Sequence, residues 1–211
     1  MNEPQPSTLS PEHQAVRLGK VTASRLADVM ARTKTGWGAS RANYMAQLLC
    51  ERLTGTQAES YTNAAMQWGI DTEEQARAAY ELVSGSKVSK IGFVPHPTIA
   101  MSGASPDGLV DDAGLVEFKC PITATHIDTL LNESVDGKYL TQMQWQMACT
   151  GRKWCDFVSF DPRLPSNMQL FMVRIDRDNV AIRDMEAVVS SFLAELDAKH
   201  KALIARYGDA P

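Results

Sequence analysis

Paired cysteines, clustered histidines and long apolar runs are all missing from this chain of 211 residues. The four cysteines have irregular spacing without a C-x-x-C pair, which argues against a disulfide framework or a zinc site. The four histidines show neither metal-ligand nor triad spacing, so we interpret them as structural. No apolar run approaches the roughly 20 residues of a membrane-spanning helix, and the first residues do not resemble a signal peptide. We therefore expect a cytoplasmic protein without membrane contact.

The length and composition predict one folded domain. A hydrophobic content of 44% is enough to bury a substantial core, and no repeat of 20 to 50 residues is present. Residues 1–10 are polar and proline-rich, so we expect them to form a disordered arm. Residues 11–211 then make up the single domain.

The net charge of −4 argues against a protein that coats nucleic acid without specificity. The charge is unevenly distributed, however. Residues 1–52 contain seven Lys or Arg against four acids, a net charge of +3, which leaves −7 for the remainder. The basic N-terminal part fits either a DNA-facing surface or ordinary solvated helices, whereas part of the acidity elsewhere would belong to a metal site.

The most informative stretch is residues 105–119. Val116 and Phe118 alternate with Glu117 and Lys119, which is the period of a strand that carries both polar groups on one side. A tight turn at residues 111–114 would fold residues 108–110 back beside this strand. The hairpin would bring Asp107 towards Glu117.

Two carboxylates that converge on a half-buried sheet repel one another unless a cation lies between them. Oxygen ligands favour Mg²⁺, with Mn²⁺ as a substitute, over zinc. The Lys119 ammonium, on the same face as Glu117, could hold a metal-bound water or offset charge on a phosphate. Asp107, Glu117, Lys119 and a divalent metal together predict a phosphodiesterase, although a turn followed by the solvated face of a strand would show the same residues.

This arrangement resembles the PD-(D/E)xK nuclease superfamily. The fuller pattern, Ser-Pro-Asp-Gly at 105–108 and Glu-Phe-Lys-Cys-Pro at 117–121, resembles the phage lambda exonuclease or YqaJ-type viral recombinase family in particular. The resemblance implies a restriction-endonuclease-like α/β (α+β) core, with a central mixed sheet flanked by helices. It also implies one or two Mg²⁺ ions, with the backbone carbonyl of Phe118 completing the ligands of Asp107 and Glu117.

Residues far from this hairpin carry further parts of the resemblance. Arg17 and Ser24 match an arginine and a serine that form a pocket for the 5′-phosphate of a DNA end, and Gln142 falls at the position of a glutamine beside that pocket. Ser105, just before the hairpin, is also a predicted DNA-binding residue. Ser24 also lies at the predicted start of a helix, where free N–H groups favour an anion, although plain capping would explain it too. Lys34, in a basic loop of residues 33–38, is a further candidate DNA contact.

Glu73 lies three residues before Ala76 and seven before Tyr80 in a predicted helix of residues 63–83, which places it on the buried stripe. A buried carboxylate needs a partner, and a metal centre would provide one. Gly69 and Glu73 match the Gly-x-x-x-Glu of the family, which implies a metal ligand, direct or through water. By sequence alone, an acid in a helix is usually a solvated charge.

The remaining pattern predicts helices and strands in a mixed order. The expected helices cover residues 11–16, 22–30, 40–53, 63–83, 123–131, 138–150 and 178–205, with Gly55 and Gly85 as stops and Ser40 as a cap. The expected strands cover residues 87–94, 99–102, 108–110, 115–119, 154–160 and 169–175. Helicase-linked relatives have Gln-x-x-x-Tyr in the helix of Gln142, but Gln146 stands at the tyrosine position here, which favours the phage branch.

The family implies a 5′-to-3′ exonuclease that digests one strand of linear double-stranded DNA to mononucleotides and leaves a 3′ overhang. It also implies a toroidal homotrimer, a single-strand annealing protein as partner, and a phage or prophage in a bacterial cell. Two alternatives stay open. A related endonuclease or junction resolvase would use the same residues, and a DNA clamp without catalysis would bind DNA but leave it intact.

Overall fold

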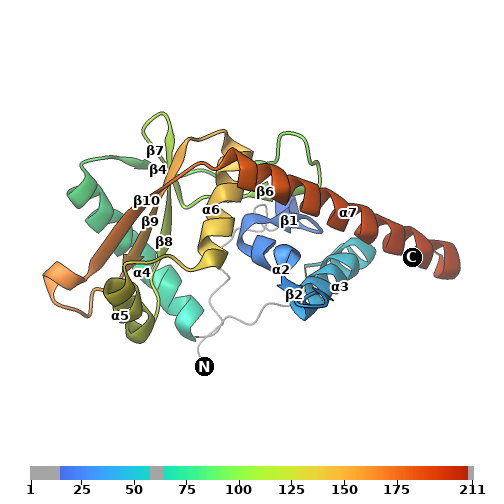
Figure 1. The fold of residues 1–211 in the computed structure, drawn as a ribbon, viewed down its shortest axis with the longest axis horizontal. Coiled ribbons are helices and arrows are strands. Elements are labelled where there is room, and N and C mark those ends of the chain that lie inside the picture. Colours follow the sequence, from blue (N-terminus) through green and yellow to red (C-terminus); the bar gives the residue numbers. More distant parts are fainter. Residues whose placement is uncertain (1–14, 58–63, 209–211) are drawn as a thin grey trace, which may run out of the picture.

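Helix α6 (Gly137–Thr150) lies between a mixed sheet and a group of helices (Figure 1). The computed structural model describes residues 15–57 and 64–208. The sheet, with α4 (Ala64–Ser84) and α5 (Thr123–Asn132), lies on one side of α6. Helices α2 (Leu26–Met30), α3 (Ala39–Thr54) and α7 (Asn179–Tyr207) lie on the other. The predicted α/β class, a mixed sheet flanked by helices, is confirmed.

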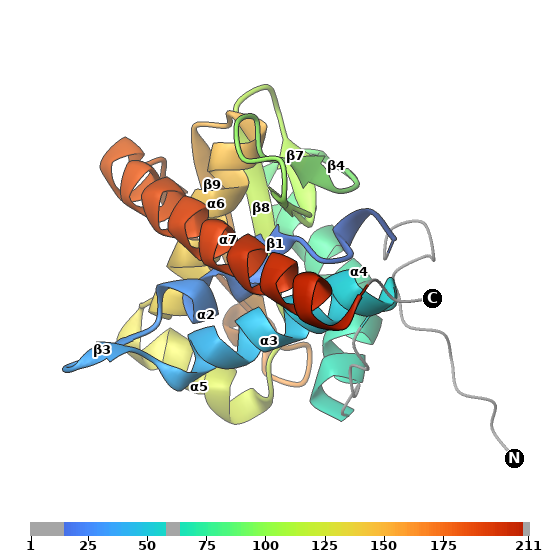
Figure 2. The ribbon, with the colours of Figure 1, turned by 90° about the vertical axis from the view of Figure 1, so that its right-hand side faces the viewer.

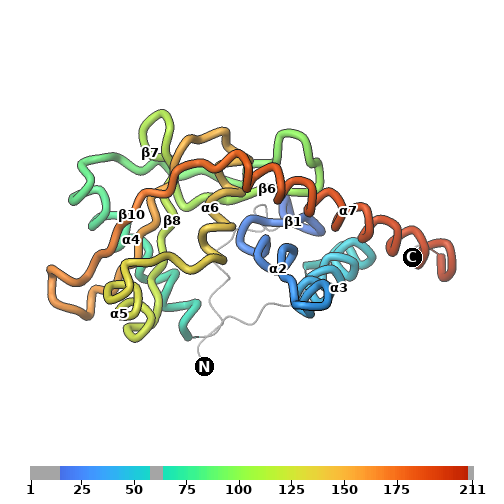
Figure 3. Tube along the Cα trace, in the orientation of Figure 1, coloured from blue at the N-terminus to red at the C-terminus, as the bar shows by residue number. Residues whose placement is uncertain are grey.

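The sheet has five strands in the order β10-β9-β8-β7-β4. The strands are β4 (Val88–Ser89), β7 (Gly108–Val110), β8 (Gly114–Lys119), β9 (Trp154–Phe160) and β10 (Leu170–Asp176). Only the β8–β9 pair is parallel, and the chain crosses from one to the other through α5 and α6 (Figure 3). This crossover brings α6 over the strand that carries Glu117 and Lys119.

Strand β8 is buried on both faces. Val116 and Phe118 pack with Ala76 and Tyr80 of α4, whereas Leu115 packs with methionines of α6. The predicted alternation of the strand is therefore confirmed, but the face that carries Glu117 is covered by α6. A carboxylate on this face is removed from water, which strengthens its interactions with nearby charges.

A second core joins α2, α3 and α7 to the outer side of α6. Leu26, Tyr44, Trp145 and Phe192 are among its fully buried side chains. Helix α7 begins after Asp178, whose carboxylate accepts hydrogen bonds from the next turn, and runs diagonally across α2 and α3 (Figure 2). None of the helices in the described part of the chain is long and apolar enough to cross a membrane.

Several boundaries in the N-terminal half differ from the sequence-based predictions. Helix α3 is capped by Gly38, and Ser40 lies inside it. The expected loop of residues 33–38 contains a short hairpin of β2 (Arg32–Thr33) and β3 (Gly36–Trp37). Gly55 ends α3 in the left-handed conformation, as predicted. The expected arm of residues 1–10 and most of the first helix lie outside the described residues.

The two strands expected between α4 and the hairpin are shorter and belong to different sheets. Residues 87–94 contribute only β4 and the first residue of β5 (Val94–Pro95), and residues 99–101 form a turn before β6 (Ser102–Ala104). Strand β6 pairs with β5 and, in parallel, with β1 (Val21–Thr22). Pro95 lies on an edge strand, where its missing N–H is tolerated. This small sheet brings the segment before α2 next to residues 102–105.

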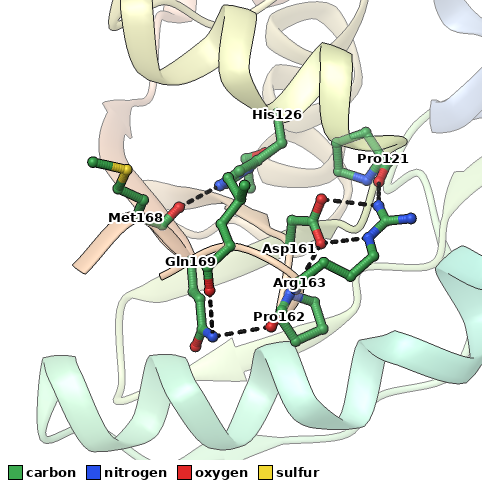
Figure 4. Close-up of polar contacts among 9 residues, drawn as sticks. Pro121, His126, Asp161, Pro162, Arg163, Met168 and Gln169 are labelled. Carbon is green, nitrogen blue, oxygen red and sulfur yellow. Dashed lines mark hydrogen bonds and ion pairs between the residues drawn. The ribbon is translucent and has the colours of Figure 1, made fainter. Parts of the chain in front are cut away.

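A buried carboxylate ties the end of the large sheet to helix α4. Asp161 accepts two hydrogen bonds from the Arg163 guanidinium, at 2.7 and 2.8 Å, and Arg163 also donates to the Pro121 carbonyl (Figure 4). The guanidinium lies 4.1 Å from the ring centroid of Trp68 on α4. The fully buried His126 ring bonds Ser159 and the Met168 carbonyl nearby. These contacts hold the start of α4 beside the end of β8.

The Asp161 contacts predict a loss of stability in acid. Burial raises the pKa of this carboxyl, but hydrogen bonds from Arg163 and Thr123 outweigh it and lower the pKa to about 2. The stabilisation is present above the ordinary pKa of 3.8 and is lost as the pH falls from there towards 2. Thermal unfolding over this range should give a shallower pH dependence of Tm for Asp161→Asn than for wild type. Equal slopes would show that this ion pair does not contribute.

Candidate nuclease site

The β7–β8 hairpin holds the predicted acidic site. Asp107 precedes β7, and its Oδ2 accepts a hydrogen bond of 2.7 Å from the Phe118 backbone N–H. Glu117 and Lys119 lie two residues apart on β8, and the Lys119 Nζ lies 2.5 Å from the Glu117 Oε1. The Phe118 backbone is thus fixed between the two acids. The hairpin brings Asp107 towards Glu117, as predicted.

The Glu117 carboxylate is almost fully buried and accepts hydrogen bonds from two side chains of α6. Its side chain is 1% exposed. Gln142 Nε2 donates to Oε1 at 2.5 Å, and Gln146 Nε2 donates to Oε2 at 2.6 Å. Both oxygens of this carboxylate therefore have fixed positions.

Burial and the neighbouring charges shift the pKa values of Asp107 and Lys119. Burial and the negative charges of Glu117 and Glu73 raise the pKa of Asp107 well above its usual range, against the opposing effect of Lys119. Burial alone would lower the pKa of Lys119, but the attraction of Glu117 and Asp107 outweighs it and raises the pKa. Lys119 is therefore a protonated hydrogen-bond donor at neutral pH, and an added cation would relieve the repulsion among the acids.

The ligands available to a metal ion are oxygen atoms. Residues 15–57 and 64–208 contain no group of three or more His, Cys, Asp or Glu side chains arranged to hold a metal ion. Mg²⁺ commonly uses only one or two carboxylates and keeps several waters. The buried Glu117 and the half-buried Asp107 suit such an ion, because its positive charge would offset the repulsion that raises the pKa of Asp107.

A polar cavity of about 180 Å³ opens beside these acids. Its lining includes the four predicted phosphate-binding residues together with the acids and lysine of the hairpin: Arg17, Ser24, Ser105, Gln142, Asp107, Glu117 and Lys119. The Arg17 guanidinium donates to the Ser105 Oγ at 3.2 Å. Among the described residues, Arg17 forms no ion pair with a carboxylate, so its charge is available to an anion.

Glu73 lies at the rim of the site. It lines two further cavities of about 430 and 480 Å³, both of which also include Asp107. Its side chain is 42% exposed, so the expectation of a buried carboxylate is wrong, and Arg77 lies 3.5 Å from it. Residue spacing identified the correct side of α4, but the helix packs so that Thr72 and Ala76 are buried and Glu73 borders the open cavities. The next residue, Glu74, is 74% exposed.

Ser24 differs from its expected setting, whereas Lys34 lies in a turn within the expected loop. Ser24 lies in a short 3-10 turn (Ala23–Arg25) before the five-residue α2, so the helix dipole expected to attract an anion is small. Lys34 lies in the exposed turn between β2 and β3, outside the three cavities described above, and its contact with DNA stays a prediction. Instead, the guanidinium groups of Arg32 and Arg41 lie 3.8 and 4.3 Å from the Trp37 ring centroid.

Two residues of the site were missed by the sequence analysis. Gln146 contacts Glu117 directly, and the available signal was its spacing of four from Gln142, which places both on one face of a helix. Tyr139 lies one turn before Gln142, with the Lys119 Nζ 4.9 Å from its ring centroid, and lines the cavity of about 480 Å³. An aromatic ring beneath an ammonium favours the charged form.

A family model described as the YqaJ-like viral recombinase domain matches residues 12–153, about two thirds of the chain. The chain belongs to this family. The match includes Arg17, Ser24, Asp107, Glu117 and Gln142. A comparison with curated proteins gave no match.

Solved structures give the same relationship over a longer stretch. The crystal structure of LHK-Exo in complex with dAMP is 56% identical, with a TM-score of 0.88, over 93% of this chain and 97% of that one. An alkaline exonuclease structure, LHK-Exo from Laribacter hongkongensis, is 55% identical over the same shares, with a TM-score of 0.87. A phage-related exonuclease from Haemophilus somnus 129PT is 19% identical over 87% and 96%, with a TM-score of 0.72, and shares the fold. Together with the family, these relatives support a nuclease role for this chain.

Proposed function

We propose that this protein is a metal-dependent 5′-to-3′ exonuclease that digests one strand of linear double-stranded DNA to mononucleotides. The observation that carries the proposal is the single polar cavity that combines Arg17, Ser24 and Gln142 with Asp107, Glu117 and Lys119. An anion pocket that borders acids suited to a metal would hold a terminal phosphate next to the bond to be cut. Such an arrangement recognises a DNA end, which an enzyme that cuts internally does not need.

Each residue has a distinct part in the proposed reaction. Asp107, Glu117 and the Phe118 carbonyl would hold Mg²⁺, with Mn²⁺ as a substitute, and Glu73 would reach the site through water. Two ions would use all of these groups. When bound, the metal acts as a Lewis acid and makes water a stronger nucleophile at neutral pH. The protonated Lys119 hydrogen-bonds the attacking water or the phosphate oxygens and offsets the negative charge that develops there.

The end of the DNA would be held by the phosphate pocket. The Arg17 guanidinium forks onto the terminal 5′-phosphate, while Ser24, Ser105 and Gln142 donate further hydrogen bonds. Fixing this phosphate sets which phosphodiester lies beside the acids, so each cut releases one nucleotide. That a similar protein was crystallised with dAMP is in keeping with a mononucleotide product.

We further propose a toroidal homotrimer that encloses DNA and acts with a single-strand annealing protein in the cytoplasm of a bacterial cell, on behalf of a phage or prophage. A ring holds its substrate topologically, which suits a protein with a net charge of −4. The 3′ overhang left by the enzyme would be the substrate of the annealing protein.

One experiment separates this function from its alternatives. Linear duplex labelled at either 5′ or 3′ ends is incubated with Mg²⁺ or with Ca²⁺, beside a covalently closed circle. With Mg²⁺ but not with Ca²⁺, we expect release of the 5′ label as a mononucleotide and delayed release of the 3′ label. The circle should stay intact. A cut circle would indicate an endonuclease or resolvase, and binding without cleavage would indicate a clamp.

A further inference from the structure

Gln146 fixes one oxygen of the buried acid Glu117. Its Nε2 donates to Glu117 Oε2 at 2.6 Å, and the Gln146 side chain is fully buried. Gln142, one turn earlier on α6, donates to the other oxygen. The two amides approach the carboxylate from the same helix, so the position of Glu117 depends on how α6 packs against β8.

The two carboxylate oxygens differ in how many hydrogen bonds they accept. Oε1 accepts from both Lys119 Nζ and Gln142 Nε2, at 2.5 Å each. Oε2 accepts from Gln146 alone among the described residues. Because a carboxylate oxygen offers about two lone-pair positions, Oε1 is saturated and Oε2 keeps one position open. A cation can therefore bind Oε2 without displacing a hydrogen bond.

The orientation of Gln146 is not explained by its own hydrogen-bond requirements. Its Oε1 is buried and has no hydrogen-bond partner among the described residues, which is unfavourable for folding. Turning the amide over would not help, because Oε1 would then face the Glu117 carboxylate. The side chain satisfies Glu117 and leaves its own acceptor unpaired, as expected of a residue retained for the site.

We infer that Gln146 is a positioning residue that holds Glu117 Oε2 ready to bind a divalent metal ion. This inference rests on the proposed function, since it assumes that Glu117 is a metal ligand. Residues that hold a metal ligand in place typically change metal affinity by about 10- to 100-fold when they are removed. The effect should appear in metal binding even when no DNA is present.

The test compares Gln146→Met with Gln144→Met. Gln144 is a matched control on the same helix, is 7% exposed, and bonds the Asp176 carbonyl and the Asp178 N–H, away from the acids. Titration calorimetry with Mn²⁺ should show about 10- to 100-fold weaker binding for Gln146→Met and wild-type binding for Gln144→Met. In cleavage assays, Gln146→Met should need more Mg²⁺ for half-maximal rate and recover most of kcat when Mg²⁺ is saturating.

Wild-type Mn²⁺ affinity in a folded Gln146→Met protein would overturn the inference. If this variant does not fold, Gln146→Ala, which leaves room for water, is measured in the same way. Asp107→Asn separates the inference from the proposed function. If wild type and Asp107→Asn bind Mn²⁺ equally, the metal site itself is wrong, whereas loss of binding in Asp107→Asn with none in Gln146→Met removes only the role of Gln146.

Discussion

An Asp107→Asn variant should cleave DNA at least about 10² to 10³ times more slowly than wild type and remain folded. The change removes one of the two acids that would hold the metal, yet the asparagine oxygen can still accept the Phe118 N–H. Single-turnover rates on 5′-phosphorylated linear duplex measure the loss. Glu117→Gln and Lys119→Ala should show losses of similar size, because each removes a charge aimed at the transition state.

The same Asp107 variant should be at least as stable as wild type when metal is absent. The raised pKa of Asp107 shows that its ionised form is disfavoured by burial and by Glu117, so a neutral amide relieves repulsion at neutral pH. Tm in the presence of a chelator tests this, and Mg²⁺ should raise Tm for wild type more than for the variant. Asp112→Asn, on the exposed turn of the same hairpin, is the control. Near wild-type cleavage by folded Asp107→Asn would refute the proposed site.

Arg17→Ala should slow digestion of phosphorylated ends by roughly 10- to 150-fold, the equivalent of a charge-assisted contact of about 1.5 to 3 kcal/mol. Removing the terminal phosphate from the DNA should slow the wild-type enzyme by a similar factor, since both changes delete one interaction. Combining them should add little. Rates for the four combinations of protein and DNA give the coupling directly.

Arg25 provides a control for Arg17, because it lies in the same segment but is ion-paired with Asp28 at 2.6 Å. Arg25→Ala should therefore leave the preference for phosphorylated ends unchanged. If Arg17→Ala retains the wild-type ratio of rates on phosphorylated and dephosphorylated ends, Arg17 does not bind the terminal phosphate. The acids of the hairpin would be unaffected by that outcome.

Local patterns predicted the hairpin and most helices well. The alternation around Glu117 matched β8, and Gly55 and Gly85 mark helix ends in the left-handed conformation, because glycine adopts it without strain. The later helices and strands, from α5 to α7, lie within about two residues of their predicted bounds. The short strands before the hairpin were predicted poorly, since two- and three-residue strands depend on pairing partners distant in sequence.

The identity of the site's acids and lysine was determined by the sequence itself, because two-residue alternation on a strand places Glu117 and Lys119 together whatever surrounds them. Tertiary structure decided how these groups are held. Gln142 and Gln146 reach Glu117 across 25 and 29 residues, and Arg17 reaches Ser105 across 88. The burial of Glu117 and the partial exposure of Glu73 likewise depend on how α6 and α4 pack on the sheet. Periodicity specifies which face of an element a residue occupies, whereas the neighbour of that face is set by packing between distant segments.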